Sequence, residues 1–215
     1  MAKRPAFFIQ DGQVISKLYS FEWFPGFAIS QKQKSIESLH NAIAETDMNA
    51  SPLEISTKST NALGVKLSAF HLKLHNYTLE NIFQSAKVFE NGGPYLDLLE
   101  VLPKEAKRDT RLRNSGSLLS FRYQNEDFPI IPKTAFYDYI YIAAVKNMYS
   151  LDEIKPITNY NYFTDIEFNP DKSINTQART ASILKLMIED YGFLPDLSKE
   201  EFIQYHQKHV GLSLQ

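Results

Sequence analysis

The residues from Thr134 to Lys146 form the segment that most restricts how this chain can fold. They read Thr-Ala-Phe-Tyr-Asp-Tyr-Ile-Tyr-Ile-Ala-Ala-Val-Lys, so a helix over about 134–147 is apolar on nearly every side. A helix that is apolar all round is buried in a large core or in a membrane. Since no run approaches the ~18 apolar residues of a membrane span, we expect a buried central helix. A chain of 215 residues is long enough to enclose it without disulfides.

Shorter elements are expected on both sides of this helix. Asp11-Gly12 lies between two apolar runs, which predicts a hairpin over 5–18 with a type I′ turn. Apolar spacing predicts further helices at about 30–45, 79–90, 95–102, 173–191 and after Ser198. The expected N-caps are Ser30, Thr78, Ser198 and either Ser173 or Asn175. Short strands are expected at 53–56, 67–72, 118–123, 128–131 and 160–168. Because these elements do not alternate as βαβ units, we predict an α+β fold with a helical majority.

The composition excludes several classes of protein. The chain has no cysteine, which rules out a disulfide scaffold, a cysteine-based metal site and a cysteine nucleophile. Its formal net charge of -2 gives no global basic field, so any contact with nucleic acid must be local. The 12 Tyr and 15 Phe indicate either a dense core or flat rings that stack on bases. Met-Ala-Lys-Arg-Pro lacks the apolar run of a secretory signal, and we expect a cytoplasmic protein.

Three polar residues of the predicted helix 79–90 form the first candidate site. Glu80, Gln84 and Lys87 lie at positions i, i+4 and i+7, so they share one helix face. A solvated polar face explains this spacing as well as a ligand site does. In a ligand site, the carboxylate can act as a base and the ammonium as an acid, nucleophile or phosphate partner, which suits cleavage of a glycosidic bond.

Two further candidates lie near the end of the chain. Asp165 and Glu167 alternate with apolar residues at the end of a predicted strand, although Asn169-Pro170-Asp171 is also an ordinary turn signal. Residues 172–179 open the last long helix, whose free N–H groups favour either a phosphate or simple capping side chains. His71 and His75 lie four apart outside any predicted helix, so we predict no metal site.

Many segments, in order from Phe21 to about Ile188, resemble one family. They are Phe-Glu-Trp-Phe-Pro-Gly-Phe at 21–27, Gln-Lys-Gln-Lys-Ser-Ile at 31–36, Glu-Ile-Ser-Thr-Lys-Ser at 54–59, Leu-Ser-Ala-Phe at 67–70, Leu-Glu-Asn-Ile-Phe-Gln-Ser-Ala-Lys at 79–87, Gly-Gly-Pro-Tyr at 92–95, Ala-Lys-Arg-Asp at 106–109, Thr-Ala-Phe-Tyr-Asp-Tyr at 134–139, Phe-Thr-Asp-Ile-Glu-Phe-Asn-Pro at 163–170 and Lys-Ser-Ile-Asn at 172–175. Together they resemble the NADAR superfamily, and most closely its branch of antitoxins associated with DarT-type toxins that ADP-ribosylate guanine in DNA. Many relatives carry Trp where Phe168 stands, and a Gly-rich stretch where this chain has Asn-Pro-Asp-Lys-Ser.

The resemblance implies a single NADAR-like domain over 1–215, with an extension over 1–50, a catalytic core over 51–192 and a C-terminal helix over 193–215. It implies an N-glycosidase that removes ADP-ribose from guanine in DNA, without a cofactor or metal. The implied catalytic residues are Glu80, Lys87 and Asp165. The implied substrate-binding residues are Trp23, Lys58, Ser59, Ser68, Phe70, Gln84, Arg108, Phe168, Lys172 and Asn175. Among them, Lys58, Arg108 and the helix start at 173–177 are expected to bind the pyrophosphate, and Trp23, Phe70 and Phe168 are expected to stack on the adenine and guanine.

The expected partners are ADP-ribosylated DNA, ADP-ribose and a cognate DNA ADP-ribosyltransferase toxin, with no membrane. Two alternatives stay open at this point. One is an N-glycosidase of the same superfamily that acts on a phosphorylated riboflavin-pathway intermediate. The other is a non-enzymatic antitoxin that neutralises its toxin by binding it.

Overall fold

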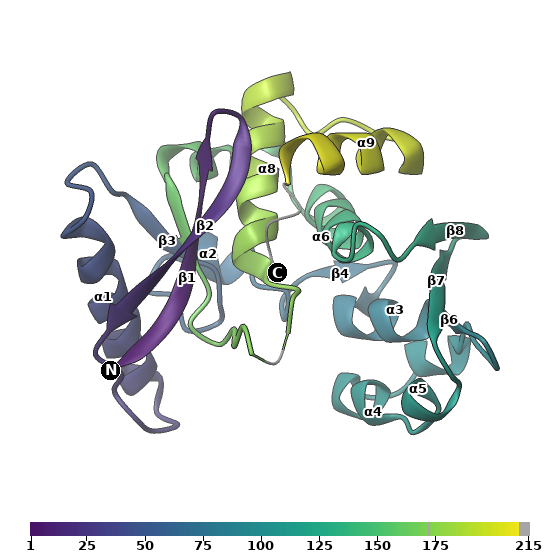
Figure 1. The fold of residues 1–215 in the computed structure, drawn as a ribbon. Helices are drawn as coiled ribbons and strands as arrows, with labels where there is room; N and C mark the ends of the chain where they lie inside the picture. The colour runs from purple at the N-terminus through teal and green to yellow at the C-terminus, as the bar shows by residue number, and fades with distance from the viewer. Residues whose placement is uncertain (172, 211–215) are drawn as a thin grey trace. The chain divides into compact units, whose positions relative to one another are not determined.

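The structure is a computed structural model, and it describes residues 1–171 and 173–210 (Figure 1). Contacts divide the chain into two compact units. The first unit comprises Met1–His71, Tyr149–Asp196 and Gln207–Gln215, and the second comprises Leu72–Met148 and Leu197–His206. The division into a single domain with an N-terminal extension, a catalytic core and a C-terminal helix stays a prediction. The mixed α+β class with an N-terminal hairpin is confirmed. No helix in the described ranges is both long and apolar enough to cross a membrane.

A four-stranded sheet organises the first unit. Its order is β2 (Gln13–Phe21), β1 (Ala2–Gln10), β9 (Tyr162–Thr164) and β3 (Pro52–Glu54). β1 is antiparallel to both β2 and β9, whereas β3 runs parallel to β9. Asp11 and Gly12 have φ angles of 51° and 71°, as a two-residue type I′ turn requires, so the predicted hairpin is confirmed and is longer than expected.

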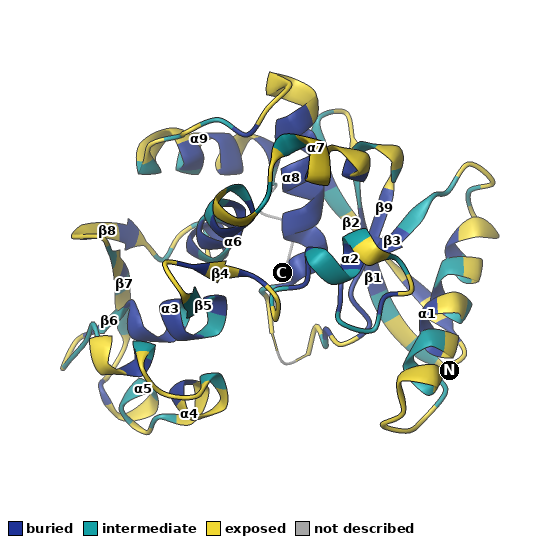
Figure 2. Cartoon of the chain, turned by 180° about the vertical axis from the view of Figure 1, so that it is seen from behind, coloured by how far each residue is buried: buried dark blue, intermediate teal, exposed yellow. Residues whose placement is uncertain are grey.

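Two long helices pack on this sheet. α1 (Ile29–Ala44) buries Ile36, Leu39 and Ile43 beside Tyr19 and Phe21 of β2. α8 (Gln177–Tyr191) packs on β1 and β9, and Figure 2 shows buried residues along most of its length. The predicted caps Ser30, Ser173 and Asn175 are wrong. Ala28 precedes α1 without a side-chain hydrogen bond, and the Thr176 hydroxyl accepts from the Ala178 N–H at the start of α8.

The predicted strand at 67–72 is also wrong. The Asn61 side chain caps the short helix α2 (Ala62–Lys66) by accepting from the Leu63 N–H. After α2 the chain forms turns. Leu67 and Leu72 are fully buried through packing, without a partner strand among the described residues. Gly64 allows the close packing, because an added Cβ would lie 2.0 Å from the Glu54 carbonyl oxygen. The first unit also contains α7 (Leu151–Ile154) and η2 (Lys155–Asn159).

The second unit is built around α6 (Ala135–Met148), which is the central helix that the sequence predicts. Phe136 is 1% exposed and packs on Phe121, Phe128 and Phe83 with ring centroids 4.6, 5.1 and 6.1 Å away. The dense-core explanation of the aromatic residues is therefore confirmed for this unit. His206 of α9 (Lys199–His209) places Nε2 2.9 Å from the buried Asp138 carboxylate of α6. The predicted Ser198 cap is confirmed, since Ser198 and Glu201 form a capping box.

The other elements of this unit are short. They are β4 (Lys73–Leu74), β5 (Tyr77–Thr78), α3 (Leu79–Ser85), β6 (Lys87–Phe89), η1 (Leu96–Leu99), α4 (Pro103–Arg108), α5 (Arg111–Asn114), β7 (Leu118–Tyr123) and β8 (Glu126–Pro129). The predicted helix 79–90 ends at Ser85, because residues 87–89 pair with β7 in a three-stranded antiparallel sheet. Lys87 therefore lies on strand β6, and the prediction that it shares a helix face with Glu80 and Gln84 is wrong. The predicted helix at 95–102 is the single turn η1.

Candidate functional site

Glu80, Gln84 and Lys87 of the second unit are joined in one hydrogen-bonded run. Thr78 begins α3 by accepting from the Asn81 N–H, which confirms the predicted cap. The Lys87 Nζ donates to the Gln84 Oε1 at 2.7 Å, and the Gln84 Nε2 donates to the Glu80 Oε1 at 2.7 Å. The sheet turns Lys87 back toward α3, so the three side chains meet although only two of them lie on the helix.

The environment of Lys87 favours a reactive amine. Burial lowers the pKa of Lys87, and the nearby Lys107 lowers it further, against the opposing charge of Glu80. The Lys87 Nζ also lies 5.0 Å from the centroid of the Phe83 ring. Lys107 forms an exposed ion pair with Glu80, with Nζ 3.7 Å from Oε2. A larger neutral fraction makes the Lys87 amine a better nucleophile or base than an exposed lysine.

Asp165 of the first unit lies in the turn after β9 and is 6% exposed. Its Oδ1 accepts from the Glu167 N–H at 3.1 Å, and its Oδ2 accepts from the Thr176 hydroxyl at 3.4 Å. Burial raises the pKa of Asp165 to about 7, and the charge of Glu54 adds to this rise. A carboxyl that titrates near neutral pH can both hold and release a proton under working conditions.

Glu54 on β3 is a buried carboxylate to which the sequence assigned no role. It is 2% exposed, and it accepts from the Thr164 hydroxyl at 2.6 Å and from the Ile166 N–H at 2.8 Å. His40 of α1 joins the same cluster, with Nε2 2.9 Å from the Thr164 Oγ1. Burial raises the pKa of Glu54 and lowers the pKa of His40 to about 4, so the histidine is neutral. The sequence feature that could have indicated the buried Glu54 is its position between Leu53 and Ile55 in a short apolar run.

The serine and lysine candidates of the first unit lie in the loops around α2. Ser68 is fully buried and donates to the Gln177 Oε1 at 3.4 Å, while the Ala69 N–H donates to the same oxygen at 2.7 Å. Ser59 is 8% exposed, and its hydroxyl accepts from the Asn61 N–H. Lys58 is half-buried and donates to the Thr57 hydroxyl at 2.9 Å. These contacts hold the loops in place, and the predicted contacts with substrate stay predictions.

The three candidate stacking rings differ in how much surface they present. Phe70 is 78% exposed, whereas Phe168 is 8% exposed and presents the least surface of the three. Trp23 is half-buried, and its ring lies 4.6 Å from the Lys32 Nζ and 5.4 Å from the Arg4 guanidinium carbon. Cations so close to the Trp23 ring match the chemistry of a site that binds an anionic nucleotide.

The candidates for binding phosphate are spread over both units. Arg108 is exposed at the end of α4 in the second unit. Lys172 lies outside the described residues. Asn175 precedes α8 in the first unit, and its buried Oδ1 has no hydrogen-bond partner among the described residues. An oxygen without a donor costs free energy, so this position suits a ligand or water that donates a hydrogen bond.

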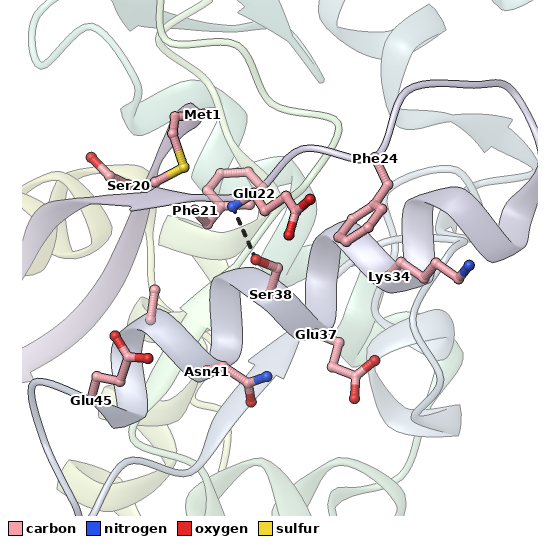
Figure 3. A pocket seen from close by; sticks show the side chains of 11 residues that line it. Met1, Ser20, Phe21, Glu22, Phe24, Lys34, Glu37, Ser38, Asn41 and Glu45 are labelled. Atoms are coloured by element: carbon pink, nitrogen blue, oxygen red, sulfur yellow. Dashed lines mark hydrogen bonds between the residues drawn. The ribbon is translucent and has the colours of Figure 1, made fainter.

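A surface depression of about 440 Å³ lies along β2 and α1 in the first unit (Figure 3). Glu22, Glu37 and Glu45 line it, with Lys34 as its one lysine, and none of the predicted site residues takes part. Acidic side chains repel the pyrophosphate of ADP-ribose. We therefore assign no role in the reaction to this depression.

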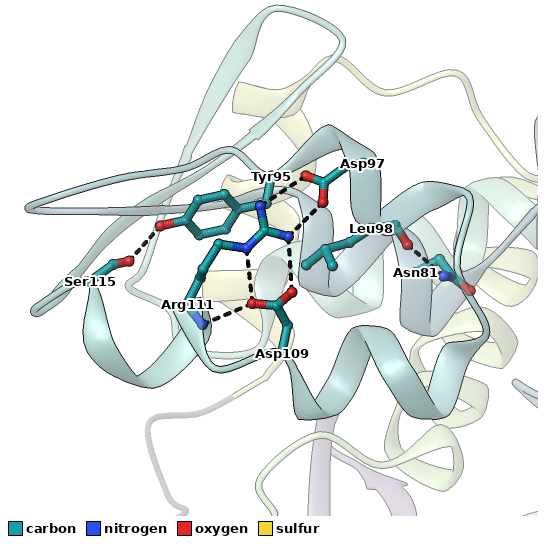
Figure 4. A network of polar contacts seen from close by, with 7 residues as sticks. All are labelled: Asn81, Tyr95, Asp97, Leu98, Asp109, Arg111 and Ser115. Atoms are coloured by element: carbon teal, nitrogen blue, oxygen red, sulfur yellow. Dashed lines mark hydrogen bonds and ion pairs between the residues drawn. The ribbon is translucent and has the colours of Figure 1, made fainter.

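Arg111 is the centre of a network of polar contacts in the second unit (Figure 4). Its guanidinium donates to both oxygens of Asp97, at 3.2 and 2.5 Å, and to both oxygens of Asp109, at 3.0 and 2.9 Å. The guanidinium carbon lies 4.5 Å from the centroid of the Tyr95 ring, and the Tyr95 hydroxyl bonds to Ser115. Two carboxylates already use the donors of Arg111, so it braces η1 against α5 and is unsuited to binding phosphate.

Within residues 1–171 and 173–210, no group of three or more His, Asp or Glu side chains is placed to hold a metal ion.

Comparison with known families adds one match. A family model described as DarT1-associated NADAR antitoxin matches residues 2–213, which is almost the whole chain. No curated protein matches the chain.

Proposed function

The chain belongs to the family of DarT1-associated NADAR antitoxins, and we propose that it is a glycohydrolase that removes ADP-ribose from guanine bases in DNA. This activity reverses the lesion made by a cognate DarT-type toxin in the cytoplasm. The family supports the association with such a toxin, and the chemistry of the candidate residues supports the type of reaction. ADP-ribosylated DNA is the substrate, and free ADP-ribose is a product.

The observation that carries the proposal is the hydrogen-bonded run from Lys87 through Gln84 to Glu80. Cleavage of an N-glycosidic bond needs a nucleophile at the anomeric carbon and a proton for the departing base. This run contains the Lys87 amine, whose pKa is lowered, and the Glu80 carboxylate. The Gln84 amide bonds to both groups and holds them close together. Asp165, with a pKa of about 7, is the candidate of the first unit for moving a proton.

Two mechanisms fit these residues. In the first, Glu80 or Asp165 takes a proton from water, the water oxygen bonds to the anomeric carbon, and guanine leaves as its amino nitrogen gains a proton. In the second, the Lys87 amine attacks the ring-opened sugar, an imine forms as protonated guanine leaves, and water then hydrolyses the imine. Both consume one water molecule and release ADP-ribose and unmodified guanine.

The test uses an oligonucleotide that carries ADP-ribosylated guanine, with release of ADP-ribose followed over time. We expect Glu80→Gln and Lys87→Ala to lower the rate at least ~100-fold, because each removes a group that handles a proton or the sugar. Glu80→Gln should keep its free energy of unfolding within about 1 kcal/mol, whereas Lys87→Ala removes the donor to the buried Gln84 amide oxygen and should cost about 1–3 kcal/mol. Lys104→Ala is the matched control, since Lys104 is an exposed lysine of α4 that takes no part in the run, and it should keep nearly the wild-type rate.

Near-wild-type rates from both variants would contradict the role of this run and leave the residues around Asp165 as the remaining site. Borohydride added during turnover separates the two mechanisms, because it reduces an imine to a stable adduct on lysine that intact mass detects. A protein that neutralises the toxin equally well after Glu80→Gln and Lys87→Ala acts by binding the toxin. Activity only on a phosphorylated riboflavin-pathway intermediate would indicate the other N-glycosidase function.

A further inference from the structure

Glu54 holds the chain on both sides of Asp165. Its carboxylate accepts from the hydroxyl of Thr164, the residue before Asp165, and from the N–H of Ile166, the residue after it. The backbone adds a third link, because the Ile55 N–H donates to the Thr164 carbonyl oxygen at 2.8 Å. The turn that carries Asp165 is therefore fixed at both neighbours by one side chain and by the β3–β9 pairing.

The other polar groups near this turn are a histidine, an amide, an exposed carboxylate and a buried arginine. His40 on α1 is neutral and bonds to Thr164, and the Gln177 amide on α8 bonds to Asp165. Glu167 is 41% exposed, and its charge is paired with Lys32 at 3.4 Å. Arg179 of α8 directs its Nη1 to the Ile174 carbonyl oxygen at 2.7 Å. Glu54 is thus the buried acidic neighbour of Asp165.

We propose that Glu54 is a positioning residue for Asp165, which fixes the turn and keeps a second negative charge beside it so that Asp165 holds a transferable proton. This inference rests on the proposed function, because the proton of Asp165 would be used in the release of ADP-ribose. The like charge disfavours ionisation of Asp165, and hydrogen bonds from the Ile166 N–H and from the Thr164 and Ser56 hydroxyls stabilise the charge on Glu54. The carboxyl of Asp165 is the catalytic candidate, and Glu54 acts through it.

Glu54→Gln isolates the charge, because the hydrogen bonds of the cluster can be kept. The new amide oxygen can accept from the Ile166 N–H while its NH₂ donates to the Thr164 hydroxyl. That hydroxyl can then donate to His40 in its other neutral tautomer. We expect the titration midpoint of Asp165 to fall by about one pH unit after the neighbouring charge is removed. Burial still acts on Asp165, so the shift should be partial.

Glu167→Gln is the matched control. It also removes a carboxylate close to Asp165 in the chain, but this carboxylate is exposed and already paired with Lys32. The control should leave the Asp165 midpoint within a few tenths of a pH unit of the wild-type value. The midpoint is measured directly in the full-length protein by ¹³C NMR of labelled aspartate carboxyls, with Asp165→Asn used to assign the signal.

The second readout is the pH profile of ADP-ribose release, whose inflection should move in the same direction as the NMR midpoint in Glu54→Gln. An unchanged NMR midpoint in a folded Glu54→Gln variant overturns the inference, whether or not the protein has the activity. A shifted midpoint with a profile that does not move also overturns it, because Asp165 would then not hold the proton of the reaction. If the wild type releases no ADP-ribose but the midpoint shifts, the proposed function fails and only the electrostatic coupling of Glu54 to Asp165 stands.

Discussion

Asp165→Asn should make the protein more stable at alkaline pH while it removes the activity. The buried Asp165 carboxyl is difficult to ionise in the folded protein, so its pKa is raised to about 7. The unfolded chain exposes the same carboxyl to water, where its pKa is ~3.9. An amide at this position carries no charge in either state, so the variant avoids the cost of burying a charge beside Glu54.

The sign follows from proton binding. Between about pH 4 and pH 7 the folded protein keeps the Asp165 proton and the unfolded chain has lost it, so the folded state binds more protons and stability falls as pH rises. This contribution is complete below ~3.9, and it is lost by the time the pH has passed about 7. A difference of about three pKa units, at ~1.36 kcal/mol each, gives an upper limit of about 4 kcal/mol. We expect a net gain of about 1–2 kcal/mol at pH 8, because the amide replaces the hydrogen bonds to Glu167 and Thr176 imperfectly.

The assay is urea denaturation of the wild type and the variant from about pH 5 to pH 8, with unfolding free energies obtained by linear extrapolation. The stability of Asp165→Asn relative to the wild type should increase steadily over this range. Glu54 also has a raised pKa and contributes to the slope of both proteins, so the difference between them reports Asp165 together with its coupling to Glu54. A difference that is constant with pH would refute the reasoning, since the Asp165 carboxyl would then titrate alike in both states.

Three further results are expected. Free ADP-ribose should stabilise the folded protein by ~2.7 kcal/mol at 100 times its Kd, and the absence of both a thermal shift and a heat of binding at millimolar ADP-ribose would contradict the proposed ligand. Activity should persist in EDTA, because the proposed reaction uses the carboxyls and the amine of the protein together with water; loss of activity that one divalent metal restores would show the opposite. Gly64→Ala should lower the melting temperature strongly, because the added Cβ would lie 2.0 Å from the Glu54 carbonyl oxygen; a melting temperature equal to that of the wild type would show that α2 can shift freely.

Features set by neighbouring residues could be predicted from the sequence. Asp11-Gly12 fixes its turn through backbone angles that few other pairs adopt, and the Ser198 capping box lies within four residues. The central helix over 134–147 could be predicted because a helix that is apolar on nearly every side, and too short to cross a membrane, is stable when it is buried in a core. In each case the stabilising contact and the residues that specify it are close in the sequence.

Features set by distant partners could not be predicted. Residues 87–89 continue the apolar pattern of α3, but pairing with β7 makes them a strand. The segment 67–72 has the composition of a strand, yet it forms turns in which the Ser68 hydroxyl and the Ala69 N–H donate to the Gln177 side chain of α8. Tertiary contacts outweigh the intrinsic preference of short segments, which is only a fraction of a kcal/mol per residue. The helical argument for Lys87 was therefore wrong, although the sheet returns its amine to Gln84.

The buried acids of the first unit give a physical reason, separate from the family match, to seek function around Asp165. Burial raises the pKa values of Glu54 and Asp165, and the charge of Glu54 raises that of Asp165 further. Such a pair makes the folded protein less stable at neutral pH than amides or apolar residues would. Groups that lower the free energy of unfolding and titrate near neutral pH are characteristic of sites that move protons. The stability lost at such a site is offset by contacts elsewhere in the fold. If Asp165→Asn gives a more stable and inactive protein, the turn after β9 is maintained for chemistry and not for folding.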